Sequence, residues 1–130
     1  MGILKVNLSD VKEPTIIEAN TEVTLRIISV KEGVDKNGNN YIQPVFEVPE
    51  VPEAKSFSYF LSIPNDQMDA KKKQNSGWRL LQFLTAFGVN SDGEIDLEDL
   101  IGLTADAILG VESSEQYGDQ NYVKRFVAVA

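Results

Sequence analysis

Apolar and polar residues alternate along much of the chain, the pattern typical of half-buried strands. Residues 21–31 alternate and then shift phase at Ile28, which predicts a strand with a bulge. A turn-rich stretch follows, and a second alternating run occupies residues 41–48, so residues 21–48 are predicted to form a hairpin. After a break that contains two prolines, a third strand is predicted over residues 57–63.

One segment follows the helical period instead. The sequence WRLLQFLTAF repeats large apolar residues at helical spacing and ends before Gly88, which predicts a helix over residues 76–88. The polar stretch ahead of it contains Lys71, Lys72 and Lys73 and is expected to be a mobile loop.

Two more strands complete the pattern. They are predicted over residues 104–112 and 122–129, so that residues 104–129 form a second hairpin. Residues 1–20 form an N-terminal segment, in which residues 3–8 are expected to add a short strand.

The element order is therefore β-β-β-α-β-β in one domain spanning residues 1–130. The expected fold class is all-β with one helix, and a five-stranded Greek-key barrel of the oligonucleotide/oligosaccharide-binding (OB) type has this order. Such barrels bind ligands on the face of strands two and three, beside two long loops. An SH3-like barrel and an open α+β sheet have the same element count and remain alternatives.

The amino-acid composition excludes several kinds of chemistry. A chain of 130 residues with 42% hydrophobic and 25% charged residues suits one globular domain. It contains no cysteine and no histidine, which excludes disulfides, zinc–thiolate sites, thiol catalysis and histidine bases. No apolar run is long enough to span a bilayer, and the first residues lack a secretion signal, so we expect a soluble protein of the cytoplasm without membrane contact.

The net charge of −8 is unevenly spread. Residues 1–79 hold ten Lys and Arg against eleven Asp and Glu, whereas residues 80–123 hold nine carboxylates and no basic residue. An anionic ligand can therefore still use the first two-thirds of the chain. The acidic linker at residues 90–99 has no EF-hand spacing, so we expect a solvated linker and no metal or other cofactor.

No motif of catalysis is present. The chain has no Gly-rich phosphate loop, no nucleophile elbow and no carboxylate pair at a spacing that indicates catalysis. We therefore expect a binding protein rather than an enzyme.

Three short motifs resemble a known family. They are Ala86-Phe87-Gly88, then Asp99-Leu100-Ile101-Gly102, and finally a strand from Asn121 to Phe126. With the hairpin of residues 21–48, they resemble the small phage-type single-stranded-DNA-binding proteins over roughly residues 15–128. The resemblance implies an OB fold, sequence-independent binding of single-stranded DNA in phage replication or recombination, proteins of those processes as partners, and a location in the infected bacterial cell.

Single-stranded DNA is held by aromatic rings that stack on bases and by cations that contact phosphates. The candidates for stacking lie beside polar or turn residues or at the helix start: Tyr41, Phe60, Tyr117, Tyr122 and Trp78. The candidates for phosphate contacts are the basic residues Arg26, Lys31, Lys36, Lys71, Lys72, Lys73, Arg79, Lys124 and Arg125.

Each candidate also has a purely structural interpretation. Either Phe60 points outward and Phe57 and Tyr59 inward, or the reverse, and Trp78 at a helix start is often a core anchor. The second function class is therefore a protein-interaction or virion-structural module, in which the aromatic residues are buried and no nucleic acid is bound.

Overall fold

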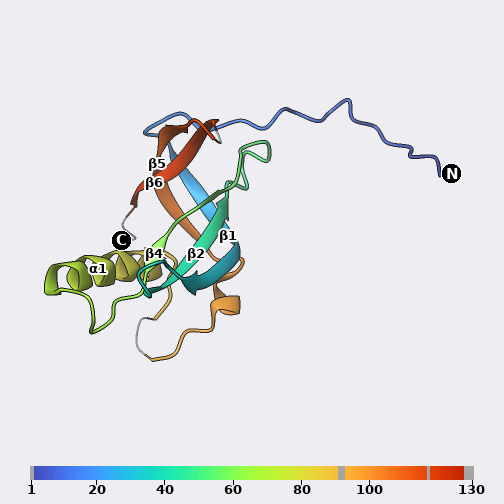
Figure 1. Ribbon diagram of the computed structural model, residues 1–130. Coiled ribbons are helices and arrows are strands. Elements are labelled where there is room, and N and C mark those ends of the chain that lie inside the picture. The colour runs from blue at the N-terminus through green and yellow to red at the C-terminus, as the bar shows by residue number, and fades with distance from the viewer. Residues whose placement is uncertain (1, 91–92, 117, 128–130) are drawn as a thin grey trace.

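The computed structural model describes residues 2–90, 93–116 and 118–127 and is built mainly of strands with one helix (Figure 1). This confirms the predicted class of mostly β structure with a single helix. The elements are β1 (Glu22–Val34), β2 (Asn40–Glu47), β3 (Phe57–Ser58), β4 (Leu61–Ser62), α1 (Ala70–Ala86), the short 3₁₀ helix η1 (Leu97–Leu100), β5 (Thr104–Ser114) and β6 (Gly118–Phe126).

The strands form one antiparallel sheet of six strands in the order β3-β2-β1-β5-β6, with β4 also paired to β2. The two ends of this path come close, with Cα atoms of β3 and β6 within 8 Å of each other. Within the described parts of the chain, no ladder joins these two strands, so the sheet is curled but not closed. A closed barrel of five strands is therefore not confirmed.

The third strand is split where one continuous strand over residues 57–63 was predicted. Phe57 of β3 pairs with Phe46, and Leu61 of β4 pairs with Ile42, in one unbroken register. Between them lies Pro44 of β2, which has no N–H to donate to a neighbouring strand. Its carbonyl accepts from the N–H of Tyr59 at 2.9 Å, but the ladder is interrupted there.

The helix begins at Ala70, six residues before the predicted start at residue 76. Asp69 caps it, since its carboxylate accepts from the backbone N–H of Lys72 at 2.8 Å. The three consecutive lysines therefore lie in the first turn of α1, and the predicted mobile loop is wrong. The end was predicted well, because Gly88 follows α1 with a φ of +74°.

The predicted bulge in β1 is confirmed, since the register shifts between Ile27 and Ser29. The last strand begins at Gly118, not at residue 122. Residues 2–14 form no strand, so the short strand expected at residues 3–8 is wrong. No helix in the described residues is both long and apolar enough to cross a membrane.

The core lies between the curled sheet and α1, which lies beside β4 and β6 (Figure 1). Its centre is a cluster of phenylalanines: the ring of Phe87 lies 5.6 Å from Phe46 and 5.0 Å from Phe83, between centroids. Leu25 and Ile27 of β1 complete it from the sheet and are fully buried. Because the core fills the inner face, polar and aromatic residues of the hairpin are left on the outer face.

Candidate nucleic-acid interface

The outer face of β2 and β4 is where the predicted stacking residues first come together. Along β2, Ile42, Pro44 and Phe46 are buried, so that Tyr41 and Gln43 point to the other face. In the split third strand Phe57 is buried and Phe60 is 41% exposed. The alternative in which Phe60 points outward is therefore confirmed.

Tyr41 and Phe60 form an adjacent pair of rings. Their centroids are 4.8 Å apart and their planes are inclined by 34°. The ring of Tyr41 lies over Gly33 on β1, where an added Cβ would be 2.7 Å from the phenol oxygen. The absence of a side chain at Gly33 therefore allows the ring to lie flat against the sheet beside Phe60.

Polar side chains surround the two rings. The amide nitrogen of Gln43 donates to the hydroxyl oxygen of Ser58 at 3.1 Å, and Lys31 of β1 lies opposite Gln43 in the register. Ser62 of β4 lies opposite Tyr41. The rings thus lie on a face that offers hydrogen-bonding groups and one cation close by.

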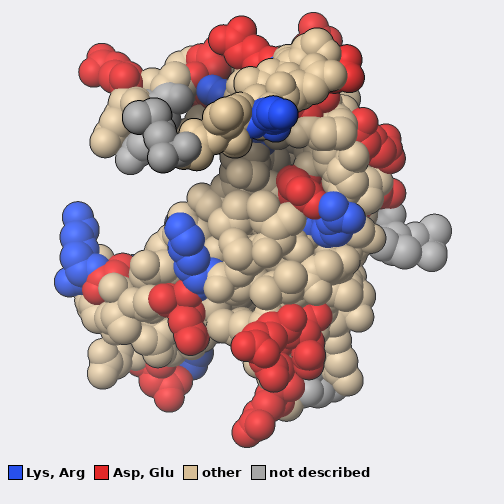
Figure 2. Space-filling model, turned by 90° about the vertical axis from the view of Figure 1, so that its right-hand side faces the viewer, with Lys and Arg blue, Asp and Glu red and all other residues tan. Residues whose placement is uncertain are grey.

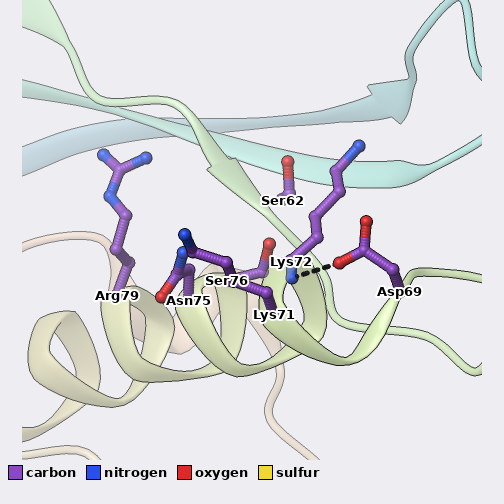
Figure 3. Close-up of a pocket in the computed structure, with 7 residues that line it drawn as sticks. All are labelled: Ser62, Asp69, Lys71, Lys72, Asn75, Ser76 and Arg79. Atoms are coloured by element: carbon purple, nitrogen blue, oxygen red, sulfur yellow. Dashed lines mark hydrogen bonds between the residues drawn. The ribbon is translucent and has the colours of Figure 1, made fainter.

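A pocket of about 350 Å³ opens next to this face, between β4 and the first half of α1 (Figure 3). It is lined by Ser62 from the strand and by Asp69, Lys71, Lys72, Asn75, Ser76 and Arg79 from the helix and its cap. Figure 3 shows the side chains of Lys72 and Arg79 rising from α1 toward the strands. Ser62, which lines the pocket, also lies directly opposite Tyr41 in the register of β2 and β4, so the pocket borders the strand that carries the aromatic pair.

The pocket is electropositive. Three basic residues line it against one carboxylate, Asp69, which is already engaged as the cap of α1. The first turn of α1, which is the positive end of the helix dipole, also borders the pocket. The guanidinium carbon of Arg79 also lies 4.9 Å from the ring centroid of Tyr59, a cation–π contact that orients its side chain.

The turn between β1 and β2 places a carboxylate near this pocket. Asp35 has a pKa below its usual value, first because the backbone N–H of Asn39 donates to it, with a further contribution from the charge of Lys72. Asp35 also accepts from the backbone N–H of Asn37 at 2.8 Å. This carboxylate shapes the turn that carries Lys36, and it reduces the local positive charge.

Two predicted phosphate-binding residues are already paired with carboxylates. Arg26 forms an ion pair with Glu47, and the ammonium of Lys73 lies 2.6 Å from Asp66. Hydrogen bonding from Lys73 also lowers the pKa of Asp66. These two cations are therefore less available to a phosphate than Lys72 or Arg79.

The remaining predicted cations lie on different elements of the fold. Within 4.0 Å, Lys31, Lys36, Lys71, Lys72, Arg79, Lys124 and Arg125 have no carboxylate partner among the residues that the structure describes. The ammonium of Lys124 donates to the side-chain oxygen of Asn20 at 2.6 Å. Lys124 and Arg125 lie on β6, which β1 and β5 separate from β2 in the sheet. The structure thus brings Lys71, Lys72 and Arg79 together in one pocket, and neither cation of β6 lines it.

The other predicted stacking residues do not join the pair. Tyr122 lies on β6, over Gly110, and Tyr117 falls outside the described residues. Trp78 is 55% exposed on α1, so it is not a core anchor. It lines a separate groove with Leu81 and Phe126 rather than the pocket of Lys72 and Arg79.

The described carboxylates of the acidic linker are exposed, as predicted for a solvated linker: Glu94, Asp96, Glu98 and Asp99. Its apolar residues pack against the first hairpin, because Ile95 and Leu97 line a groove together with Ile42, Tyr41 and Gly33, and Leu100, just after the linker, is fully buried. The carboxylate of Asp96 caps η1 by accepting from the N–H of Glu98 at 3.0 Å. Asp92 lies outside the described residues, and among the described ones no three carboxylates converge as metal ligands.

Charge is unevenly distributed over the face in Figure 2, with both signs present around the hollow at its left. In Figure 2, Lys and Arg side chains stand beside a hollow at the left of the view, whereas the largest group of Asp and Glu lies at the bottom. Figure 1 shows the linker at the same level of the molecule. An approaching anion therefore meets a less negative surface at the hollow than at the bottom.

Sequence reasoning missed the polar residues of the pocket, Ser62, Asn75 and Ser76, and the contribution of Gln43. Asp69 could have indicated the earlier helix start, because it lies three residues before Lys72 and can cap a helix that begins at residue 70. With that start, residues 72, 76 and 79 fall on one face of the helix.

Comparison with known proteins adds no assignment, because neither a family model nor a curated protein matches this chain. We therefore infer the function from the residues and their geometry.

Proposed function

We propose that this chain binds single-stranded DNA without sequence preference, through the outer face of β2 and β4. Bases stack on Tyr41 and Phe60, and phosphates contact Lys31, Lys72 and Arg79. The single observation that carries the proposal is the pair of rings at 4.8 Å beside a pocket lined by cations. Stacking tolerates any base because every base has a π-face, and cations bind the backbone common to all sequences.

We also propose that the fold is of the OB type. The sheet order β3-β2-β1-β5-β6 is that of an OB barrel if β3 and β4 count as one interrupted third strand. OB barrels are partly open and bind oligonucleotides on the face of strands two and three. The aromatic pair lies on the corresponding face of this chain, formed by β2 and β4.

The biological setting of the proposal rests on the resemblance of the sequence to phage-type single-stranded-DNA-binding proteins. On that basis we propose that the chain acts in phage replication or recombination, in the cytoplasm of an infected bacterial cell. Proteins of those processes are the expected partners besides DNA, and the proposal includes no enzymatic activity and no cofactor.

Single strands are preferred to duplex for a physical reason. In a duplex the bases are stacked on each other and cannot reach Tyr41 and Phe60, so that only phosphate contacts remain. Those contacts are few, and the net charge of −8 opposes them. We expect about three to five phosphates to be neutralised, each contributing a log–log salt slope near −0.7.

A titration tests the proposal. Fluorescence anisotropy of a labelled dT oligomer and of a duplex of equal length is measured over a range of salt concentrations. We expect tighter binding to the single strand and a modest salt slope. Equal affinity for the duplex, or a slope steeper than about −5, would contradict the proposal, because phosphate contacts would then dominate.

The second candidate function is a protein-interaction module. The observation that favours it is the exposure of Trp78 and Leu81 on α1, away from the proposed DNA face. The same titration separates the two candidates, because a chain that acts only on proteins leaves the anisotropy of both oligonucleotides unchanged.

A further inference from the structure

The N-terminal segment exposes more apolar surface than any other part of the described chain. Ile3, Leu4, Val6, Leu8 and Val11 are 60–86% exposed. Residues 2–11, here called the arm, extend away from the body of the molecule (Figure 1). Soluble proteins rarely expose contiguous apolar groups on this scale unless a partner covers them.

The base of the arm is fixed to the body. Thr15 forms a bridge with Ala54, in which its N–H donates to Glu53 and its carbonyl accepts from Lys55. The buried side chain of Asn121 then bonds both backbone groups of Ile17, accepting and donating at 2.8 Å. The arm is therefore held at a defined base, and only its apolar end is free of the body.

The arm has the pattern of an extended segment with one apolar face. Leu4, Val6 and Leu8 alternate with the polar residues Lys5 and Asn7, so the three apolar side chains share one side of an extended chain. The strand expected from this alternation has no partner in the described part of the molecule.

A groove of matching chemistry lies elsewhere on the molecule. It has a volume of about 310 Å³ and lies between the outer side of α1 and the end of β6. Its apolar lining includes Trp78, Leu81, Ala86 and Phe126, with Gln82 and Thr85 as the polar members, and none of the described residues that line it is charged. A segment with uncharged apolar side chains fits such a groove better than a charged ligand does.

We propose that the arm of one copy of this chain docks in the α1–β6 groove of a second copy, with Leu4, Val6 and Leu8 against Trp78 and Leu81. Both surfaces are apolar and exposed in the single chain, so docking removes both of them from water. The occupant is the second copy because the arm and α1 project from opposite sides of the body (Figure 1).

The geometry also determines the kind of assembly. The arm and the groove are different surfaces, so the contact is heterologous, with the arm of each copy reaching the next one. Such contacts build rings or open chains when each arm passes to a further copy, and a two-fold dimer when two copies exchange arms. An arm of ten residues reaches about 35 Å when extended, enough to bridge two adjacent domains.

Trp78 is the only tryptophan, so its emission reports on the groove. Sedimentation velocity and Trp78 emission are measured on the full chain, without DNA, in a dilution series. We expect the mean mass to fall and the emission to shift to longer wavelength together on dilution. A chain that is monomeric throughout, or an emission that is blue-shifted at every concentration, would overturn the proposal, the latter because the arm would occupy its own groove.

Two variants locate the contact. Replacing Leu4, Val6 and Leu8 together by Ser removes the apolar face of the arm, whereas the matched control replaces Lys5 and Asn7 by Ser. We expect the first to weaken association at least about tenfold and the control to leave it unchanged. Equal association of both variants would show that the arm makes no contact.

A mixing experiment tests the head-to-tail arrangement. Leu81→Ser damages the groove at an exposed helix position, and Gln74→Ser on the same helix is its control. The arm variant and Leu81→Ser are each expected to be monomeric alone and to form a one-to-one pair when mixed, because one supplies an intact groove and the other an intact arm. Failure to pair, with wild-type association retained by the Gln74→Ser control, would overturn the proposal.

Discussion

Two tyrosines of this sheet lie across a glycine in the same way. On the first hairpin the ring of Tyr41 lies over Gly33, and on the second the ring of Tyr122 lies over Gly110. An added Cβ would be 2.7 Å from the oxygen of Tyr41 and 2.3 Å from a ring carbon of Tyr122. The local packing is the same, since an aromatic ring covers the gap left by a glycine in the neighbouring strand.

The surroundings of the two rings differ. Tyr41 has Phe60 at 4.8 Å and the pocket of Lys72 and Arg79 beyond Ser62. In the described residues Tyr122 has no ring contact. A tyrosine over a glycine therefore serves sheet packing in both hairpins. The first hairpin is a candidate binding surface because a second ring and cations lie beside its tyrosine.

The largest expected effect is on Phe60, which is half-exposed and has no part in the buried core. Phe60→Ala should lower the affinity for a dT oligomer about tenfold to a hundredfold, since stacking contributes about 1–3 kcal/mol per base. Tyr122→Ala is the comparison and should change the affinity less than about threefold. Anisotropy titrations measure both.

Thermal unfolding of the two variants is the control for folding. If Tyr122→Ala lost more affinity than Phe60→Ala while both remained folded, the DNA would run along the second hairpin. The distinction drawn between the two tyrosines would then be wrong.

The two glycines give the next largest effect. Gly33→Ala and Gly110→Ala should each lower the free energy of unfolding by about 1–3 kcal/mol, because the added methyl group pushes a tyrosine ring off the sheet. Only Gly33→Ala should also weaken DNA binding, because it displaces Tyr41 from Phe60. Urea denaturation measures the first quantity and anisotropy the second. Equal loss of binding in both variants would show that it reflects stability alone.

The sequence predicted those elements whose hydrophobic pattern lies within the element itself, and it missed features that depend on a neighbouring element. Alternation predicted β1, β2 and β5 because each of these strands buries one face along its own length. The split of the third strand was not predictable from residues 57–63, since it follows from Pro44 on the neighbouring strand. The early helix start was missed because lysines in the first turn oppose the helix dipole.

The same holds for the candidate site, where single residues could be predicted but their contacts could not. Tyr41 and Phe60 could be chosen singly, from the polar residues beside them, but their contact depends on the register between β2 and β4. The pocket depends on how α1 lies against Ser62, which no local pattern reports. For Trp78 the sequence left two interpretations open, and the structure excludes the core anchor.

The pocket cations should have a smaller effect, seen mainly in the salt dependence. Lys72→Gln and Arg79→Gln should each make the log–log salt slope shallower by about 0.7, because each removes one phosphate contact. Arg26→Gln and Lys73→Gln are matched controls, since these cations already pair with Glu47 and Asp66. If salt titrations gave the same slope for all four variants, the pocket would not be part of the DNA-binding surface.

The smallest effect is expected from the acidic linker. Glu94→Gln with Glu98→Gln removes two carboxylates and leaves Asp96, which caps η1, in place. Single-strand affinity should rise slightly and duplex affinity more, with both gains fading at high salt as the charges are screened. Loss of single-strand binding at low salt would mean that these carboxylates hold the site together, contrary to the path proposed.

The most direct measurement is a nuclear magnetic resonance titration of the ¹⁵N-labelled chain with a short dT oligomer. We expect the largest backbone amide shifts at Tyr41, Phe60, Ser62 and Lys72, with little change at Gly110 and Tyr122. Shifts centred on the second hairpin, or no shifts at any concentration of oligomer, would contradict the claim that β2, β4 and α1 form a surface for single-stranded DNA.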